Sequence, residues 1–448
     1  METRIRYAPF VIFLMTTGCV CDDPPTPLEP VSDGPREIEL VAPPSETYGG
    51  EYRKTPFDHH LLSALGNTND TGQYDPCLAR AAAEFARHLR SGRNGEIELD
   101  DDLQSLVLHH AGCTDGWVTS HVFQSSSTSE NDFVEHVRTV LEDRRENTTH
   151  FGVGRARALP PMRWTWVLFA SERHVQMDSI PRRIAQGSEV VIGGILSPGF
   201  NDPRVLILPP KSEVQHADIE TNEHRFLAKW RTLGSGKYWI EVLVTGPAGP
   251  RVAALFPVWV EIAPPTSIVL TPPEDERTIV TEQQAEALMF RLLNRDRKQH
   301  GFPPFEQSTA LAEIARGHSE DMRNNEYFAH ISPAGTTLED RLSAGRYAAR
   351  TSGENIARNR SVHDAQIGLL QSLGHRENIL NPTFTHAGIG AAFSTDQYGR
   401  RTMYLTQNFA KPQRPITRAQ FRRELEHRFS QARTNNSLPQ LRVDRAAG

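Results

Sequence analysis

The sequence has little of what marks several large protein classes. Only four cysteines occur in 448 residues, so a disulfide-dense scaffold is excluded. No apolar run is long enough to cross a bilayer, and the net charge of −6 comes without a long basic stripe, so nucleic acid is not an expected partner. Phosphate-binding loops, Cys-x-x-Cys pairs, His-Glu-x-x-His and Gly-x-Ser-x-Gly motifs are also missing, which disfavours the enzyme classes built on them.

The composition and length of the sequence indicate a soluble, globular chain with several domains. Hydrophobic residues make up 38% and charged residues 23% of the sequence, values typical of folded domains. A chain of this length is too long for one ordinary hydrophobic core. The sequence therefore predicts two or three domains.

The first residues indicate export. Arg4 and Arg6 precede an apolar run over 8–15, and Thr16-Thr17-Gly18-Cys19 follows. This pattern predicts a signal peptide over residues 1–18. The Gly18-Cys19 pair resembles a bacterial lipobox with Cys19 as the lipid-modified first residue, although Thr16 departs from the usual leucine. The alternative is plain secretion with a different cleavage point. Residues 19–51, rich in Pro, Asp and Glu, are expected to form a flexible tether.

Two further cysteines lie in the folded region. Cys77 and Cys113 are both expected in an oxidising compartment, so a disulfide between them is one prediction. The alternative is two buried free thiols.

Two domains are expected between the tether and a proline-rich linker at 263–277. Residues 52–173 combine helix-like segments at 78–89 and 133–141 with a strand-like run at 164–170. Residues 178–262 hold β-branched and aromatic runs separated by turn residues, which predicts a small antiparallel sandwich of immunoglobulin-like type. The predicted strands are 190–196, 205–208, 226–230, 238–244 and 252–262.

Residues 278–412 read as an α+β domain. Thr281 and Gln284 form a capping box before an amphipathic helix that ends near Gly301. Further helices are expected from Ser308, and from Ser361 to about Gly374. Two strands follow, joined by a turn at 396–399. Helices on both sides of a central antiparallel sheet would give a three-layer α-β-α sandwich. Residues 413–448 are expected to be a solvated, arginine-rich tail with a helix over 417–433.

Five short motifs occur in order within this last domain: Tyr327-Phe328-Ala329-His330-Ile331-Ser332-Pro333, Gly353-Glu354-Asn355-Ile356-Ala357, Gly374-His375-Arg376-Glu377-Asn378, Gly388-Ile389-Gly390 and Tyr404-Leu405-Thr406-Gln407-Asn408-Phe409. Their order and wording resemble the CAP superfamily of cysteine-rich secretory, allergen-type and pathogenesis-related proteins, in its bacterial cysteine-poor branch. The resemblance spans about residues 278–411 and implies the three-layer fold.

The resemblance also implies a cleft lined by His330, Glu354 and His375 that binds zinc or another divalent cation. Two imidazoles and a carboxylate suit zinc and leave a position for water. The family's second glutamate is missing, because the matching positions hold Leu370-Gln371-Ser372. Structural alternatives stay open: Glu354 binding loop amides, and His375 bridging the turn after Gly374. His318 falls on an apolar helix stripe and is expected in the interior.

The first domain looks like a diverged copy of the last. A helix, an Arg-Glu-Asn triplet, a Gly-x-Gly triplet and a strand occur in the same order in both. Arg144 stands where the last domain has His375, and a guanidinium cannot ligate a metal. This predicts a degenerate CAP-like module that has lost the site. A coincidental match of short motifs is the alternative.

The expected function is an exported, lipid-anchored envelope protein whose CAP domain binds a divalent cation or a small or lipid ligand. The partner would be that lipid or small molecule, or an envelope or extracellular protein, with membrane contact only through the anchor. Two alternatives remain: a metal-dependent hydrolase with Glu354 as base, and a structural adhesion module. The sequence leaves open whether the protein is an enzyme.

Overall fold

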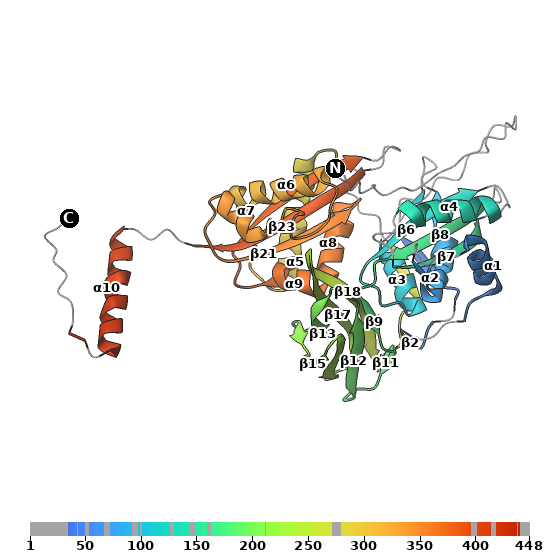
Figure 1. Cartoon of the computed structure of the whole chain (residues 1–448), viewed down its shortest axis with the longest axis horizontal. Coiled ribbons are helices and arrows are strands. Elements are labelled where there is room, and N and C mark those ends of the chain that lie inside the picture. The colour runs from blue at the N-terminus through green and yellow to red at the C-terminus, as the bar shows by residue number, and fades with distance from the viewer. Residues whose placement is uncertain are drawn as a thin grey trace.

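The computed structural model describes residues 35–42, 44–49, 53–66, 72–91, 97–98, 101–125, 130–143, 149–158, 163–210, 212–270, 279–395, 401–413, 418–436 and 438–439. They form three folded units and a C-terminal helix (Figure 1). The predicted signal peptide, Cys19, Arg144 and the turn at 396–399 lie outside the described residues.

The first unit is a four-stranded sheet with helices on both faces. Its strand order is β3 (Gln73–Tyr74), β7 (His150–Ala158), β8 (Arg163–Ser171), β6 (Val118–Ser125). Helices α2 (Pro76–His88) and α3 (Asp101–Ala111) share one hydrophobic cluster with the sheet, and α1 (Pro56–Leu65) and α4 (Glu130–Asp143) share another. A disulfide joins Cys77 with Cys113, the pairing expected from the sequence. A short ribbon, β4 (Arg90–Ser91) and β5 (Ile97–Glu98), completes the unit.

Parts of the expected tether and linker are ordered strands. β1 (Arg36–Glu39) pairs antiparallel with β19 (Ser267–Leu270), and Ile38 and Leu40 are buried against the first unit. The expectation of a tether through residue 51 and a bare linker at 263–277 was therefore wrong for these segments. Each is too short to fold alone, and their pairing satisfies backbone groups that a single strand would leave unpaired.

The second unit consists of two sheets around one core. The first sheet has the order β11 (Arg183–Ile184), β18 (Gly249–Val260), β17 (Gly236–Gly246), β13 (Asn201–Leu208), β14 (Gln215–His216). The second has the order β15 (Asp218–Asn222), β16 (Arg225–Arg231), β12 (Glu189–Leu196), β9 (Val175–Met177). Phe226, Ile240 and Phe256 are buried between them, and a short pair, β2 (Thr47–Tyr48) with β10 (Ile180–Pro181), adds Tyr48 to the same core.

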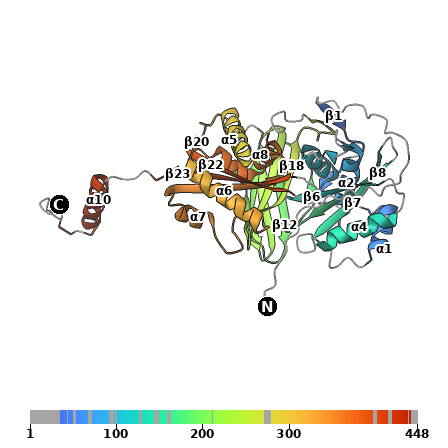
Figure 2. The same ribbon diagram turned by 90° about the horizontal axis from the view of Figure 1, so that it is seen from above.

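The third unit has a sheet of order β20 (Glu306–Gln307), β22 (His386–Thr395), β23 (Arg401–Pro412), β21 (Ala349–Asn359). Helix α6 (Thr309–Asn324) lies on one face with α7 (Leu338–Ala344), and α5 (Glu282–Gln299) and α8 (Val362–Gln371) lie on the other (Figure 2). The capping box at Thr281 and the caps at Ser308 and Ser361 are present as predicted.

Two expectations for this unit were wrong. Glu354 was expected in a loop and lies within strand β21. His375 was expected in a turn and lies in a separate helix, α9 (Leu373–Leu380). The chain breaks at Ser372, whose ψ of 125° ends α8, and a new helix starts at once. Strong pairing of β21 with β23 along its length accounts for the first error.

The Gly-x-Gly triplets play the same part in the first and third units. A Cβ atom at Gly154 would lie 1.9 Å from the backbone nitrogen of Ala83 in α2, and one at Gly390 would lie 2.1 Å from that of Arg316 in α6. In each unit a helix therefore approaches the sheet so closely that only glycine fits. Both sheets also share one pattern: a short strand parallel to its neighbour, then antiparallel pairs.

The tail contains helix α10 (Arg418–Asn435), close to the predicted range. Its apolar side chains Phe421, Leu425 and Phe429 are exposed. Among the residues that the structure describes, no helix is both long and apolar enough to span a membrane.

Candidate functional site

Glu354 is the centre of a buried polar cluster on the α6 face of the third unit. Its Oε1 lies 2.9 Å from Nδ1 of His330, and its Oε2 accepts a hydrogen bond of 2.7 Å from Nη2 of Arg341. The same Arg341 nitrogen donates to the backbone oxygen of His330 at 3.2 Å. Arg341 thus holds the carboxylate and the histidine-bearing loop together.

The charges around Glu354 keep it ionised. Burial alone would raise the pKa of its carboxyl, but the hydrogen bond from His330 and the charges of His330, His318 and Arg341 outweigh burial and lower the pKa. Glu354 is therefore a carboxylate whose two oxygens are both engaged.

His318 backs the cluster from helix α6, where the sequence predicted an interior histidine. It is buried, with Nε2 3.8 Å from Oε1 of Glu354 and Nδ1 3.4 Å from the hydroxyl of Tyr327. Tyr327 in turn donates to Asp321. Burial lowers the pKa of His318 to about 4, so its ring is neutral at physiological pH.

His375 reaches the same region from helix α9. Its Nδ1 lies 2.7 Å from Oγ of Ser372, and its backbone oxygen accepts a hydrogen bond from Asn355, the residue after Glu354. Burial, and then the charge of His330, lower the pKa of His375 to about 3. The two histidines are therefore near enough for one to act electrostatically on the other.

A polar network below the sheet was not expected from the sequence. Asn355 donates to Gln407, Gln407 to Gln366, and Gln366 to Asp296, at 3.1, 2.7 and 2.9 Å. All four are buried. These hydrogen bonds connect strand β21, which contains Glu354, to helices α5 and α8, and so fix the position of the strand. Two of its members, Asn355 and Gln407, belong to the five short motifs. Their presence in those motifs was the signal in the sequence that could have pointed to the network.

The donor chemistry of the site can be compared with what a cation needs. No group of three or more His, Cys, Asp or Glu within the described ranges lies close enough to hold a metal ion. Both oxygens of Glu354 already accept hydrogen bonds. Nε2 of His330 and of His375 make no hydrogen bond to any residue the structure describes, so the two imidazoles remain as the available ligands.

The register of the sheets shows what stands at this site in the first unit. Glu354 lies opposite Asn408, which lies opposite Gly388; Ser120 lies opposite Phe169, which lies opposite Gly152. Ser120 therefore occupies the place of Glu354. Counting along α2 and α6 from the residues that contact these glycines, Phe85 occupies the place of His318. A serine and a phenylalanine cannot form this charged cluster.

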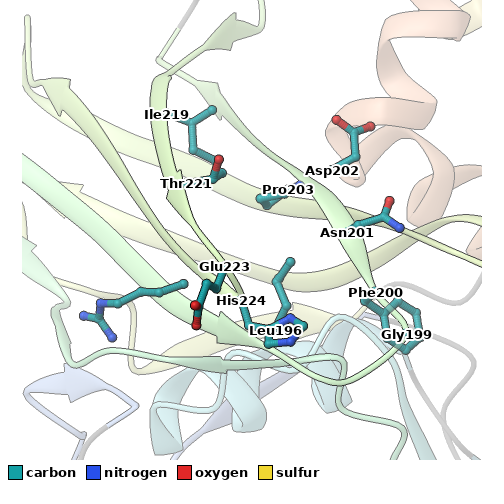
Figure 3. A pocket seen from close by; sticks show the side chains of 11 residues that line it. Leu196, Gly199, Phe200, Asn201, Asp202, Pro203, Ile219, Thr221, Glu223 and His224 are labelled. Atoms are coloured by element: carbon teal, nitrogen blue, oxygen red, sulfur yellow. The ribbon is translucent and has the colours of Figure 1, made fainter.

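A concave region lies at one end of the second unit. It has a volume of about 580 Å³, and Figure 3 shows side chains of Asn201, Asp202 and Glu223 around it. Asp202 and Glu223 adopt left-handed backbone conformations, with φ of 48° and 52°. Asp202 lies at the irregular start of β13 and Glu223 in the turn between β15 and β16. Among the described residues that line the hollow, no histidine is hydrogen-bonded to a carboxylate as His330 is to Glu354.

Comparison with known proteins shows which protein family the third unit resembles. The profile of the cysteine-rich secretory protein family, CAP, matches residues 290–409. An uncharacterized membrane protein of Bacillus subtilis (strain 168), YlbC, is 38% identical over 138 residues, which cover 31% of this chain and 37% of that protein. A second protein of the same strain, YkwD, is 36% identical over 106 residues, covering 23% of this chain and 41% of that protein. The chain thus spans about two fifths of these relatives.

Solved structures of similar proteins match at lower overall similarity. An extracellular protein containing an SCP domain from Bacillus anthracis is 28% identical, with a TM-score of 0.26, covering 40% of this chain and 66% of that one. An outer surface protein of Borrelia burgdorferi is 16% identical, with a TM-score of 0.27, covering 30% of this chain and 97% of that one.

Proposed function

The third unit of this chain belongs to the CAP superfamily, and from that premise we propose that it binds a divalent cation through Nε2 of His330 and of His375. Such a cation would act as a Lewis acid that keeps water or a partner's oxygen atom as its remaining ligand. The chain's own residues would orient the two imidazoles toward it.

The hydrogen bond between Nδ1 of His330 and Oε1 of Glu354 carries the proposal. An ionised carboxylate only accepts hydrogen bonds, so Nδ1 carries a proton; in the neutral ring, the form that binds a metal, Nε2 then carries the lone pair. A carboxylate behind a histidine in this way is the common arrangement beside bound metals, because it fixes the tautomer and raises the basicity of the ligand nitrogen. Arg341 prevents Glu354 from rotating away.

His375 supplies the second nitrogen. Its neutral state does not depend on pH in the physiological range, since burial lowers its pKa to about 3. The sequence pointed to Glu354 as a ligand or a catalytic base; the proposal gives it the orienting role instead, because both of its oxygens are engaged. The proposal therefore stops at binding and does not include hydrolysis.

The test is zinc binding by the full chain, measured by isothermal titration calorimetry in a buffer that does not chelate zinc. His330→Ala and His375→Ala should each abolish stoichiometric binding, with unchanged circular dichroism. The matched control is His386→Ala, which removes a histidine of the same unit that faces Glu306 at 3.3 Å. Stoichiometric zinc in the double variant His330→Ala/His375→Ala contradicts the proposal.

The remaining units fit an exported multidomain protein. We propose that the first unit is a degenerate CAP-like module, supported by its strand order, its Gly-x-Gly packing and Ser120 in place of Glu354. The two-sheet unit is proposed to be immunoglobulin-like, and Cys19 to carry a lipid anchor in the cell envelope. Mass spectrometry of the mature N-terminus tests the anchor: an unmodified thiol at Cys19, or cleavage elsewhere, contradicts it.

A further inference from the structure

Three side chains around Glu354 carry buried polar atoms that have no hydrogen-bond partner among the residues that the structure describes. These atoms are Nε2 of His318, Nε of Arg341, and both Oδ1 and Nδ2 of Asn408. His318 and Arg341 approach Glu354 to 3.8 and 2.7 Å, and Asn408 lies directly opposite it in the β21–β23 pair. Buried polar groups in folded proteins are almost always hydrogen-bonded, either to protein or to internal water. Their gathering around one carboxylate therefore points to a polar ligand at this place.

Asn408 faces helix α6. Its other cross-strand neighbour is Gly388, whose Cβ position lies 2.2 Å from the backbone nitrogen of Ala312 in α6. Residues directly opposite each other in a sheet point to the same face, with Cβ atoms about 5 Å apart. The amide of Asn408 is therefore next to the Glu354 carboxylate, in the layer between the sheet and α6. His318 is buried in the same layer.

The first unit shows how this layer is filled without polar groups. There Phe85 and Phe169 stand at the places of His318 and Asn408, and their rings pack together with centroids 5.5 Å apart. Helix and sheet are equally close in both units: a Cβ on the first glycine of either Gly-x-Gly triplet would lie 2.2 Å from a backbone nitrogen of the helix. A histidine and an asparagine have fewer side-chain atoms than two phenylalanines, so they leave room for a small molecule.

The hydrogen bonds of His318 decide which kind of molecule fits. The hydroxyl of Tyr327 donates its one proton to Asp321, so it can only accept from Nδ1 of His318. Burial lowers the pKa of His318 to about 4, so the ring is neutral at physiological pH and Nε2 carries a lone pair. This lone pair faces Oε1 of Glu354 at 3.8 Å, and neither atom has a proton to donate. A ligand between them has to donate to both.

We propose that the layer between α6 and the sheet contains a binding site for water beside Glu354. The water donates to Nε2 of His318 and to Oε1 of Glu354, and it accepts from Nδ2 of Asn408. Three hydrogen bonds are the usual number for a buried water molecule. The site does not depend on a bound cation.

The water completes a path of hydrogen bonds between the buried carboxylate and the surface. From Glu354 the path runs through the water to His318, then to Tyr327, and ends at Asp321, whose side chain is partly exposed. Connected hydrogen bonds of this kind strengthen one another and fix the groups that form them. His318 and Asn408 are therefore positioning residues: they hold one oxygen of Glu354 through the water, while Arg341 holds the other directly.

The direct test is a crystal structure of the full chain at a resolution that shows ordered water. We expect a water molecule within hydrogen-bond distance of Nε2 of His318 and of the Asn408 amide. In solution, oxygen-17 relaxation dispersion counts the long-lived internal waters. The double variant His318→Phe/Asn408→Phe copies the filling of the first unit and should lower that count.

Two single variants separate the water site from general packing. Asn408→Leu replaces the amide with an apolar group of similar shape, so it should also lower the number of long-lived waters. Thr406→Val is the matched control. Thr406 is buried on the same face of the same strand, but its hydroxyl is already hydrogen-bonded to Ser319 at 2.8 Å. This variant should leave the count unchanged.

The tautomer of His318 is a readout that packing alone would not change. In the full chain labelled with ¹⁵N-histidine we expect the Nδ1–H tautomer, with the Nε2 resonance displaced from the value of a free lone pair because Nε2 accepts from water. Loss of the signal in His318→Phe assigns the ring. Asn408→Leu should move the Nε2 resonance toward the free value. Tyr327→Phe removes the acceptor of Nδ1–H, so the ring should shift toward the Nε2–H tautomer.

A crystal structure without water between His318 and Asn408 overturns the proposal, and so does an unchanged count of long-lived waters in the double variant. An Nε2–H tautomer in the unsubstituted protein overturns it as well, since such a ring could donate to Glu354 itself. Should the double variant not fold, the count in Asn408→Leu decides. None of these measurements involves a metal, so their result is independent of the proposed cation site.

Discussion

Nδ1 of His330 lies 2.9 Å from Oε1 of Glu354, and Arg341 holds the opposite oxygen of the same carboxylate at 2.7 Å. A loop after one helix, a strand and a second helix thus meet at one ionised group. The pairing turns Nδ1 of His330 toward the carboxylate, and Nε2 has no hydrogen-bond partner among the residues that the structure describes.

Replacing Glu354 by glutamine should weaken zinc binding about 10- to 100-fold, because His330 loses the charged acceptor that fixes its tautomer. The free energy of unfolding of the third unit should also fall by roughly 3 kcal/mol, since Arg341 is left without its buried partner charge. Calorimetric titration and hydrogen exchange of the α6 amides measure the two effects. The control is Glu306→Gln, whose exposed carboxylate pairs with His386; an equal loss there would contradict the assignment.

Acid should destabilise the third unit through its buried histidines. Burial lowers the pKa of His318 to about 4 and of His375 to about 3, from an ordinary value of 6.5. Between these values the unfolded chain binds protons that the folded chain does not. The contribution of the two neutral, buried imidazoles to the free energy of unfolding is therefore complete above pH 6.5. It is lost as the pH falls, by up to about 1.4 kcal/mol per pH unit for each ring.

Hydrogen exchange in α6 and β22 between pH 7 and pH 5, corrected for intrinsic rates, measures this slope for the third unit. His318→Phe, which copies Phe85 of the first unit, should reduce the slope. His386→Ala, a half-buried histidine, should leave it as it is. A slope that persists unchanged in His318→Phe would mean that other groups cause the acid sensitivity.

Gly390→Ala should destabilise the third unit by roughly 3 kcal/mol, because its Cβ would meet the backbone of α6 and force helix and sheet apart. Gly154→Ala should do the same in the first unit, where the contact is with α2. Gly317→Ala is the control within α6: nothing lies within 4 Å of its Cβ position, so alanine should stabilise the helix by about 1 kcal/mol. Thermal unfolding of the three variants gives the comparison.

Removing the disulfide should destabilise the first unit by about 4 kcal/mol, the value expected for a cross-link between residues 36 positions apart. The double variant Cys77→Ser/Cys113→Ser measures this better than a reductant does. All six tryptophans lie before residue 260, so tryptophan fluorescence follows the first two units only. Hydrogen exchange should show an unchanged free energy of unfolding for the third unit. An equal loss of stability there would contradict a role of the disulfide that is confined to the first unit.

The sequence alone determined much of the third unit, because its signals are local. The capping box at Thr281 and Gln284 and the cap at Ser308 each act within one helical turn, so residue spacing was enough to place the helix starts. The Gly-x-Gly triplet was recognised as a motif, but its role in the close approach of α6 to the sheet is visible only in the structure. The five motifs likewise identified the family, because their order along the chain can be read without a structure.

Only the tertiary structure decided how the side chains of the candidate site pair. Glu354 pairs with His330 and Arg341, which lie 24 and 13 residues away, and spacing along the chain does not reveal that both oxygens are taken. Helix α9 begins where it does because Glu241, 132 residues earlier, accepts its first N–H groups. The sequence pattern could not contain that cap, since a hydrogen bond between units depends on how their surfaces meet and not on local periodicity.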